Sequence, residues 1–280
     1  MSQYPSSKSR TQVVLLGAPF DAHSSFLRGA ALAPARIRAA LNSGSSNWST
    51  ELGLDLSATN GWSDHGDVDF PDPQSAFDRT EQAARGLLAG GARLLTLGGD
   101  HVITYPLLRA IGPHYPDLTI LHIDAHSDLY DEFDGDRLSH ACPFARIMES
   151  GLARRLVQVG IRTLNPHQRR QAERFGVEIY EMRRLEAFRV TELSGPLYIS
   201  LDLDAIDPAF APGVSHYEPG GLTTRQVLDI LHQAPLPIIG ADIVEYNPVR
   251  DPLDVTAMLA AKLTKELLGR MLTSFLTEVN

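Results

Sequence analysis

The sequence predicts a single α/β domain in which a mostly parallel sheet carries helices on both faces. Short apolar runs, rich in Val, Ile and Leu with little alternation, are typical of strands that are covered on both faces. Amphipathic stretches separate these runs along the whole chain, and strands that alternate with helices form parallel sheets. No Ser-, Gly- or Pro-rich linker divides the 280 residues, which favours one domain.

The apolar runs and the amphipathic stretches give the expected elements in chain order. The predicted strands are residues 12–17, 93–97, 118–124, 156–160, 177–182, 197–202 and 238–244. The predicted helices are residues 33–41, 75–88, 102–111, 143–150, 166–175, 224–233 and 253–275. Thr223 is suited to cap the helix 224–233, because its hydroxyl can accept from the first free N–H groups. Residues 1–10 are expected to be a flexible N-terminus before a domain of residues 11–280, and residues 42–72 a long surface excursion.

Composition narrows the classes of partner. The chain has 25 Lys plus Arg against 34 Asp plus Glu, a formal charge of -9, which argues against nucleic acid as a partner. It contains no apolar run of the ~20 residues that a membrane-spanning helix needs, and the polar start MSQYPSSKSR lacks the apolar stretch of a secretory signal. With one cysteine, Cys142, an internal disulfide is impossible, so a cytoplasmic location is expected and no membrane association.

Polar residues follow three of the predicted strands at their carboxyl ends, where parallel sheets bind ligands. LLTLGGDH ends in Asp and His after two glycines that permit a close backbone approach. ILHIDAHSDLYD and YISLDLDAIDPAFAPG each run from an apolar strand into alternating acids. In an extended chain, this alternation places the polar side chains of ILHIDAHSDLYD on one face. The candidate ligands are His101, Asp124, His126, Asp128, Asp202 and Asp204.

These residue types together predict a site for two divalent metal ions. Taken singly, an Asp-x-Asp at a strand end is more often a turn or a cap, and a strand histidine is usually a core residue. Four carboxylates in one crevice, however, need counter-charge, which two divalent cations supply. The nitrogen and oxygen donors suit manganese, with cobalt or nickel as substitutes, better than zinc. His122 lies one step deeper on the same face and is expected to support a ligand instead of binding metal.

GGDH (98–101), DAHSD (124–128) and SLDLDAIDPAFAPG (200–213) resemble the three metal-binding motifs of the ureohydrolases, which include arginases and agmatinases. The resemblance extends from APFDAHSSFLRG, near residue 18, to the last helix. SHACPFARIME, GVSHYEPGGLT and GADIVEYNPVRD look most similar to the plant-type arginase branch, which is itself agmatinase-like. The resemblance implies a three-layer αβα sandwich of the arginase-like fold, two Mn²⁺ per subunit and a homo-oligomer, either a trimer or a hexamer.

The resemblance also implies a role for each motif residue. His101 and Asp128 would bind one metal and His126 and Asp204 the other, while Asp124 and Asp202 would bridge them. His140 matches the family's proton-shuttling histidine, and Glu245 matches the glutamate that holds a cationic guanidinium group. A hydroxide between the metals would attack a guanidino compound and release urea and an amine, which Asp204 or His140 would protonate.

The segment VSHYEP (214–219) is the expected determinant of the substrate. Glu218, or His216 beside it, is expected to reach the far end of the substrate, and an acid there favours agmatine, which would yield putrescine. The alternatives are L-arginine, which would yield ornithine, and another guanidino compound such as guanidinobutyrate. More remote alternatives are formiminoglutamate hydrolysis and a non-catalytic metal-binding regulatory protein. Cys142 is expected near the mouth of the site, sensitive to thiol reagents but without a role as nucleophile.

Overall fold

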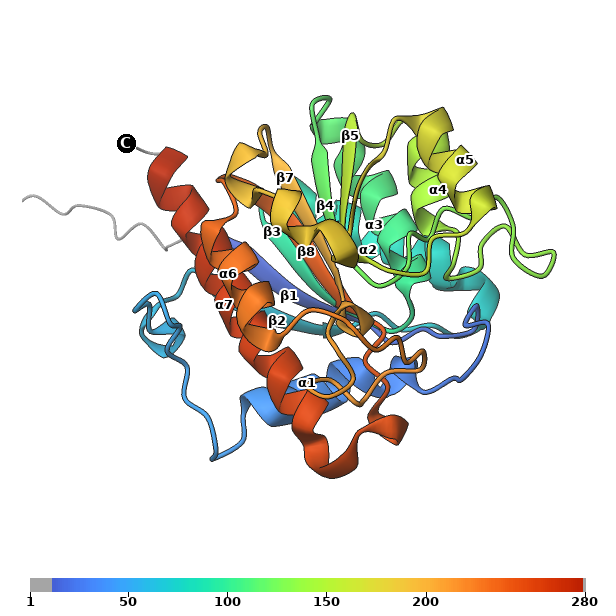
Figure 1. Cartoon of the computed structure of the whole chain (residues 1–280). Helices are drawn as coiled ribbons and strands as arrows, with labels where there is room; N and C mark the ends of the chain where they lie inside the picture. Colours follow the sequence, from blue (N-terminus) through green and yellow to red (C-terminus); the bar gives the residue numbers. More distant parts are fainter. Residues whose placement is uncertain (1–11, 279–280) are drawn as a thin grey trace, which may run out of the picture.

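The computed structural model describes residues 12–278, which fold into one domain around a single eight-stranded sheet (Figure 1). The expected flexible segment 1–10 lies outside the described residues. Every pair of neighbouring strands is parallel, in the order β2-β1-β3-β8-β7-β4-β5-β6. The strands are β1 Val13–Ala18, β2 Trp62–Asp67, β3 Arg93–Gly98, β4 Thr119–Ile123, β5 Arg155–Ile161, β6 Glu178–Glu181, β7 Leu197–Asp202 and β8 Ile238–Val244.

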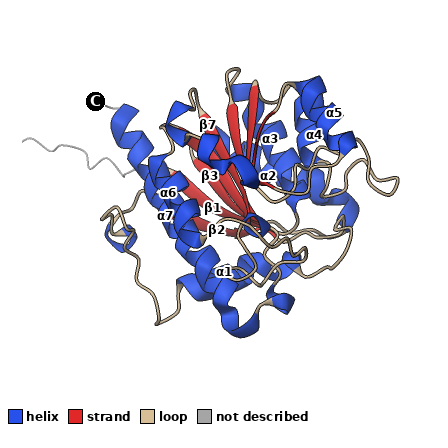
Figure 2. Ribbon diagram, in the orientation of Figure 1, coloured by secondary structure: helices blue, strands red, loops and turns tan. Residues whose placement is uncertain are grey.

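Helices cover both faces of the sheet, which confirms the predicted three-layer αβα arrangement (Figure 2). They are α1 Ala33–Leu41, α2 Ala76–Ala89, α3 Thr104–Ile111, α4 Pro143–Glu149, α5 Pro166–Phe175, α6 Thr224–Gln233 and α7 Val255–Glu278. Helices α1, α6 and α7 pack together on one face, and α2 to α5 follow one another on the other. Thr223 caps α6 as expected: its side chain accepts from the backbone N–H of Gln226.

Strand β2 was not predicted, because the sequence WSDHGD is polar and resembles a loop. It lies inside the expected surface excursion 42–72 and pairs only with β1, at the edge of the sheet. An edge strand with exposed side chains is held by backbone hydrogen bonds and needs no apolar side chains. Its sequence therefore lacks the apolar pattern by which the other strands were predicted. The expected excursion is therefore wrong for residues 62–67.

The sheet order brings the motif-bearing strands together. Strands β3, β8, β7 and β4 are consecutive neighbours in the middle of the sheet, and their carboxyl ends lie at one edge. Three of them lead into the predicted metal motifs, and β8 leads into Glu245. No helix in the described part of the chain is long and apolar enough to cross a membrane.

Candidate metal centre

The first motif depends on close packing between the ends of β3 and β1. The backbone N–H of Gly99 donates to the carbonyl of Ala18, at 3.0 Å, and the N–H of Asp100 donates to that of Phe20, at 2.8 Å. A side chain at Gly99 would collide with the Phe20 backbone, so the expected close approach is confirmed. Asp100 caps the following turn, and buried His101 lies beside the carboxylates of the other two motifs.

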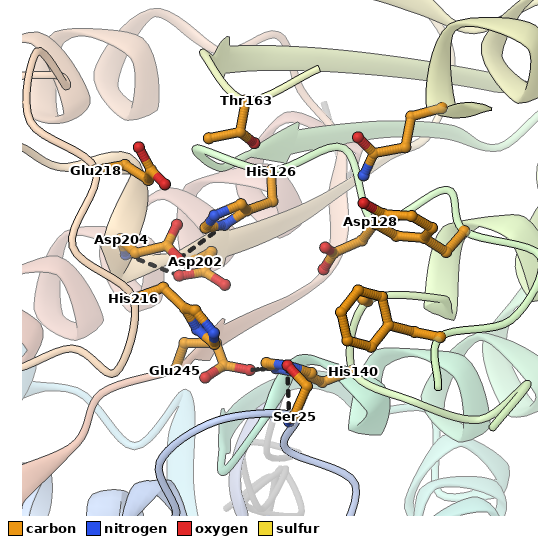
Figure 3. Close-up of a pocket in the computed structure, with 14 residues that line it drawn as sticks. Ser25, His126, Asp128, His140, Thr163, Asp202, Asp204, His216, Glu218 and Glu245 are labelled. Atoms are coloured by element: carbon orange, nitrogen blue, oxygen red, sulfur yellow. Dashed lines mark hydrogen bonds and ion pairs between the residues drawn. The ribbon is translucent and has the colours of Figure 1, made fainter. Parts of the chain in front are cut away.

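The second motif is not an extended strand, so alternation does not place its side chains on one face, contrary to the expectation from the sequence. Strand β4 ends at Ile123, and residues 124–128 form an irregular loop in which Asp128 has a φ of 49°. Asp124 Oδ1 accepts from the backbone N–H of His126 at 2.6 Å, which turns the chain at once. Asp124 still lies close to Asp128 in one group of side chains and close to His126 in another. Figure 3 shows His126 and Asp128 at the same pocket.

The third motif places two acids on one tight turn. Asp202 is the last residue of β7, and its Oδ1 accepts from the backbone N–H of Asp204 at 2.7 Å. Asp204 lies in the single 3-10 turn Leu203–Ala205 that follows. Both side chains are almost completely buried.

The six predicted ligands form two adjoining groups around Asp124. His101 Nδ1 lies 3.2 Å from Asp124 Oδ2 and 3.1 Å from the nearest oxygens of Asp128 and Asp202. His126 Nδ1 lies 3.0 Å from Asp204 Oδ2 and 3.5 Å from Asp124 Oδ1. Asp124 thus turns one oxygen to each histidine. Two sets of side chains have possible ligand atoms close together: one set is His101, His122, Asp124 and Asp128, and the other is Asp124, His126 and Asp204.

The hydrogen bonds of His101 show that its Nδ1 is suited to face a cation. Buried Asp242 accepts from Tyr198, Thr104 and Ser200, so the proton of the Ser200 hydroxyl is used there. Ser200 Oγ, 2.9 Å away, must then accept from His101 Nε2. His101 Nδ1 is left buried without a hydrogen-bond partner among the described residues, facing three carboxylates.

The electrostatics of this cluster also favour added positive charge. Burial lowers the pKa of His101, but Asp124, Asp128 and Asp202 outweigh it and raise the pKa well above its ordinary value. Burial, with the charges of Asp204 and Asp124, raises the pKa of Asp202 well above its usual range. The positively charged side chains of the cluster therefore do not neutralise the negative charge of its carboxylates. These buried nitrogen and oxygen donors fit a pair of divalent cations.

His122 contacts a predicted ligand through one nitrogen and a glutamine through the other. Gln158 Nε2 donates to the carbonyl of Ser127, at 2.6 Å, and to His122 Nδ1, at 3.0 Å. His122 Nε2 therefore carries the proton and donates to Asp124 Oδ2 at 2.7 Å. The ring also stacks on Phe144, with centroids 3.8 Å apart. This pattern supports the interpretation that His122 orients Asp124, since its proton-bearing nitrogen cannot bind a metal.

A pocket lies over the cluster, and eight of the residues singled out from the sequence line it (Figure 3). They are His126, Asp128, His140, Asp202, Asp204, His216, Glu218 and Glu245. His101 and Asp124 lie in the buried cluster behind them. Sequence reasoning missed other lining residues: Ser25, Tyr130, Phe133, Ala141, Thr163 and Gln168. Thr163 and Gln168 follow β5, so the rule that inspects strand ends could have found them.

Glu245 and His140 form a buried ion pair on one wall of the pocket. His140 Nδ1 and Glu245 Oε1 are 2.7 Å apart. Burial lowers the pKa of His140, but the charge of Glu245, helped by Asp100 and Asp128, raises it to about 9. Glu245 has a φ of 63°, and its N–H donates to the carbonyl of Gly99. A left-handed backbone at a non-glycine residue is costly, and such strain is common where a side chain must be aimed at a site.

The expected reactivity of Cys142 is not supported. Its side chain is fully buried at the start of α4. Burial, with the nearby charge of Asp128, raises the pKa of the thiol to about 12. Since the thiolate is the reactive form, we expect the native protein to react with a thiol reagent only slowly at pH 8. The reaction would be measured with a thiol reagent that releases a coloured product. We expect one equivalent of product per chain to appear rapidly once the protein is unfolded in guanidinium chloride. Rapid reaction of the native protein would contradict this burial.

Comparison with known proteins identifies the family. The profile of the Arginase family matches residues 11–269, nearly the whole chain. The chain belongs to the arginase family. Arginase 1, mitochondrial, of Arabidopsis thaliana is 47% identical, and the match covers 94% of this chain and 82% of the relative. The agmatinase of Bacillus anthracis is 34% identical, covering 92% of this chain and 91% of the relative. The structure of the arginase from Medicago truncatula is 43% identical, with a TM-score of 0.89 over 95% of this chain and 89% of that one.

Membership in the arginase family makes the chain a hydrolase that acts on C–N bonds of amidines. The expected cytoplasmic location, by contrast, is contradicted. The relatives from Arabidopsis thaliana are named mitochondrial and chloroplastic/mitochondrial, and that from Medicago truncatula is named mitochondrial. These names point away from the cytoplasm. The prediction was wrong because a single cysteine excludes an internal disulfide but does not distinguish one reducing compartment from another.

Proposed function

We propose that this arginase-family protein hydrolyses L-arginine to urea and ornithine. The observation that carries the proposal is the gap between relatives: a plant arginase is 47% identical, whereas an agmatinase is 34% identical over a similar share of the chain. L-Arginine therefore replaces agmatine as the proposed substrate, although the acid in VSHYEP led us to expect agmatine. Glu218 does line the pocket, but an acid there suits the α-amino group of arginine as well as the amine of agmatine.

We further propose that the buried cluster holds two Mn²⁺ ions. His101 and Asp128 would bind one ion, His126 and Asp204 the other, and Asp124 and Asp202 would contact both. The two oxygens of Asp124, turned toward different histidines, support this assignment. Divalent cations held there supply Lewis-acid activation of water near neutral pH.

The remaining steps fall to side chains of the pocket wall. Glu245 is a buried carboxylate that the pocket exposes on one side, so it would hold the guanidinium group by charge-assisted hydrogen bonds. As the oxygen of a water molecule adds to the guanidinium carbon, the bond from that carbon to the side-chain nitrogen breaks, and the two protons that the water gives up end on the departing amine. His140 would pass on one of them: it would donate its own proton to the amine and regain one from the water, because the neighbouring acids keep its pKa at about 9. His216 and Glu218 would contact the other end of the substrate.

A comparison of substrates tests the proposed activity. Urea release is measured with manganese-loaded protein on L-arginine, agmatine, guanidinobutyrate and formiminoglutamate, with product release from the last followed as formamide. We expect kcat/KM for L-arginine to exceed that for agmatine by about tenfold or more, a difference of about 1.4 kcal/mol in transition-state binding. A preference for agmatine would overturn the choice of substrate, and no urea from any guanidino compound would overturn the proposed function.

Assembly into a trimer or hexamer is also a proposal. It rests on the sequence resemblance and on large apolar side chains exposed just before and at the start of α7, namely Val249, Leu253 and Val255. Light scattering coupled to gel filtration would give the mass. A monomer of 30.6 kDa at micromolar concentration would contradict the proposal.

A further inference from the structure

Ser25 makes two contacts with the nitrogen of His140 that faces away from Glu245. The backbone N–H of Ser25 donates to His140 Nε2 at 3.1 Å, and the hydroxyl lies 2.7 Å from the same atom. The backbone N–H of His140 donates to the carbonyl of His23 at 3.2 Å, so three contacts join His140 to residues 23–25. Figure 3 shows Ser25 beside His140. Ser25 is exposed at the pocket, whereas His140 and Glu245 are buried behind it.

The donors and acceptors at Nε2 restrict where the protons of His140 lie. A backbone N–H can only donate, so while this contact lasts Nε2 is an acceptor and the ring proton lies on Nδ1, toward Glu245. When the ring gains a second proton, Nε2 must donate. Among the described residues, Ser25 Oγ is the acceptor that the structure places beside it. The hydroxyl can reverse its role as His140 gains and loses a proton, and the N–H cannot.

We propose that Ser25 is the positioning residue of His140: its hydroxyl holds the ring against Glu245 in both protonation states and keeps the proton on Nε2 directed into the pocket. The charged and titratable groups around the ring are Glu245, Asp100 and Asp128, with the His216 ring 5.4 Å away. None of them contacts Nε2 in the way that Ser25 does. This inference rests on the proposed role of His140 in urea release.

Steady-state kinetics of Ser25→Ala and Ser25→Thr on L-arginine test the proposal. Ser25→Ala keeps the backbone N–H and removes the hydroxyl, which among the described residues is the acceptor beside Nε2, while Glu245 still accepts from Nδ1. We expect kcat to fall about tenfold, part of what a positioned acid contributes, while KM changes less than about twofold because Glu245 is untouched. Ser25→Thr retains a hydroxyl and is expected to keep kcat within about threefold of the wild type.

Two further variants separate positioning from a general structural effect. Ser24→Ala removes the neighbouring hydroxyl, which donates to Asp100 and not to His140, and should leave kcat unchanged. In a His140→Ala background, Ser25→Ala should cause no further loss, because the residue through which it acts is gone. An equal loss in both backgrounds, an equal loss in Ser24→Ala, or full activity of Ser25→Ala would overturn the inference. A wild type that releases no urea would overturn the proposed function instead.

Discussion

Replacing Asp124 with asparagine is expected to lower urea release by about a thousandfold or more. Asp124 is the one side chain that belongs to both groups of possible metal ligands. The amide keeps the shape but removes a charge, so both proposed cations lose a ligand at once. Metal ions contribute several kcal/mol to such transition states, and about 4 kcal/mol corresponds to a thousandfold. Urea assays and metal content per chain would be measured on the same sample.

Asp134→Asn is the matched control for this substitution. Asp134 is exposed in the loop after the same motif, and its φ of 52° is one that asparagine tolerates. It should retain wild-type activity and metal content. If Asp124→Asn kept two metal ions and full activity, Asp124 would not bridge the proposed cations. A normal melting transition for both variants would show that the comparison concerns the site and not the fold.

Replacing Glu245 with glutamine is expected to lower kcat/KM for L-arginine by about a hundredfold to a thousandfold. The glutamine side chain can still accept from the backbone N–H of His101, as Glu245 Oε1 does at 2.9 Å, so the local fold should persist. The charge is lost, however, and with it the ion pair to His140 and the proposed contact to the guanidinium group. Removing one partner of a buried charge pair costs about 2–5 kcal/mol, and the expected loss of a hundredfold to a thousandfold corresponds to about 2.7–4 kcal/mol, within that range.

Glu178→Gln provides the control for a lost carboxylate charge. Glu178 pairs with Arg155 at 2.6 Å on edge strand β6, is half-buried there, and does not line the pocket. Its kinetics should match the wild type. A Glu245→Gln protein with unchanged kcat/KM would mean that Glu245 neither holds the substrate nor sustains His140. A change confined to KM would mean that Glu245 holds the substrate but does not sustain His140.

Much of the architecture could be predicted because buried parallel strands have a strong apolar pattern. The sequence predicted seven of the eight strands, and β2 lacked such a pattern because both of its faces are polar or exposed. The positions of the six proposed ligands followed from the rule that sites lie at the carboxyl ends of parallel strands. The geometry of DAHSD did not follow, because the side chains converge through a loop with a left-handed residue and not through alternation.

The contacts that join distant parts of the chain could not be predicted from patterns of spacing. Ser25 and His140 are 115 residues apart, and Asp242 supports His101 through Ser200, from a different strand. Such contacts depend on the register between neighbouring strands and on loop paths, which leave no local signal. Conversely, residues that are close in sequence can point in different directions. Cys142 lies two residues from His140 along the chain, yet its side chain is buried in the interior.

Titration of metal-free protein with Mn²⁺ tests the central claim most directly. Urea release from L-arginine and bound metal are measured together as manganese is added to protein stripped by a chelator. The proposed two-cation centre predicts no urea before metal is added and a plateau in activity at about two bound ions per chain. Full activity without metal, or a plateau at one ion per chain, would contradict it.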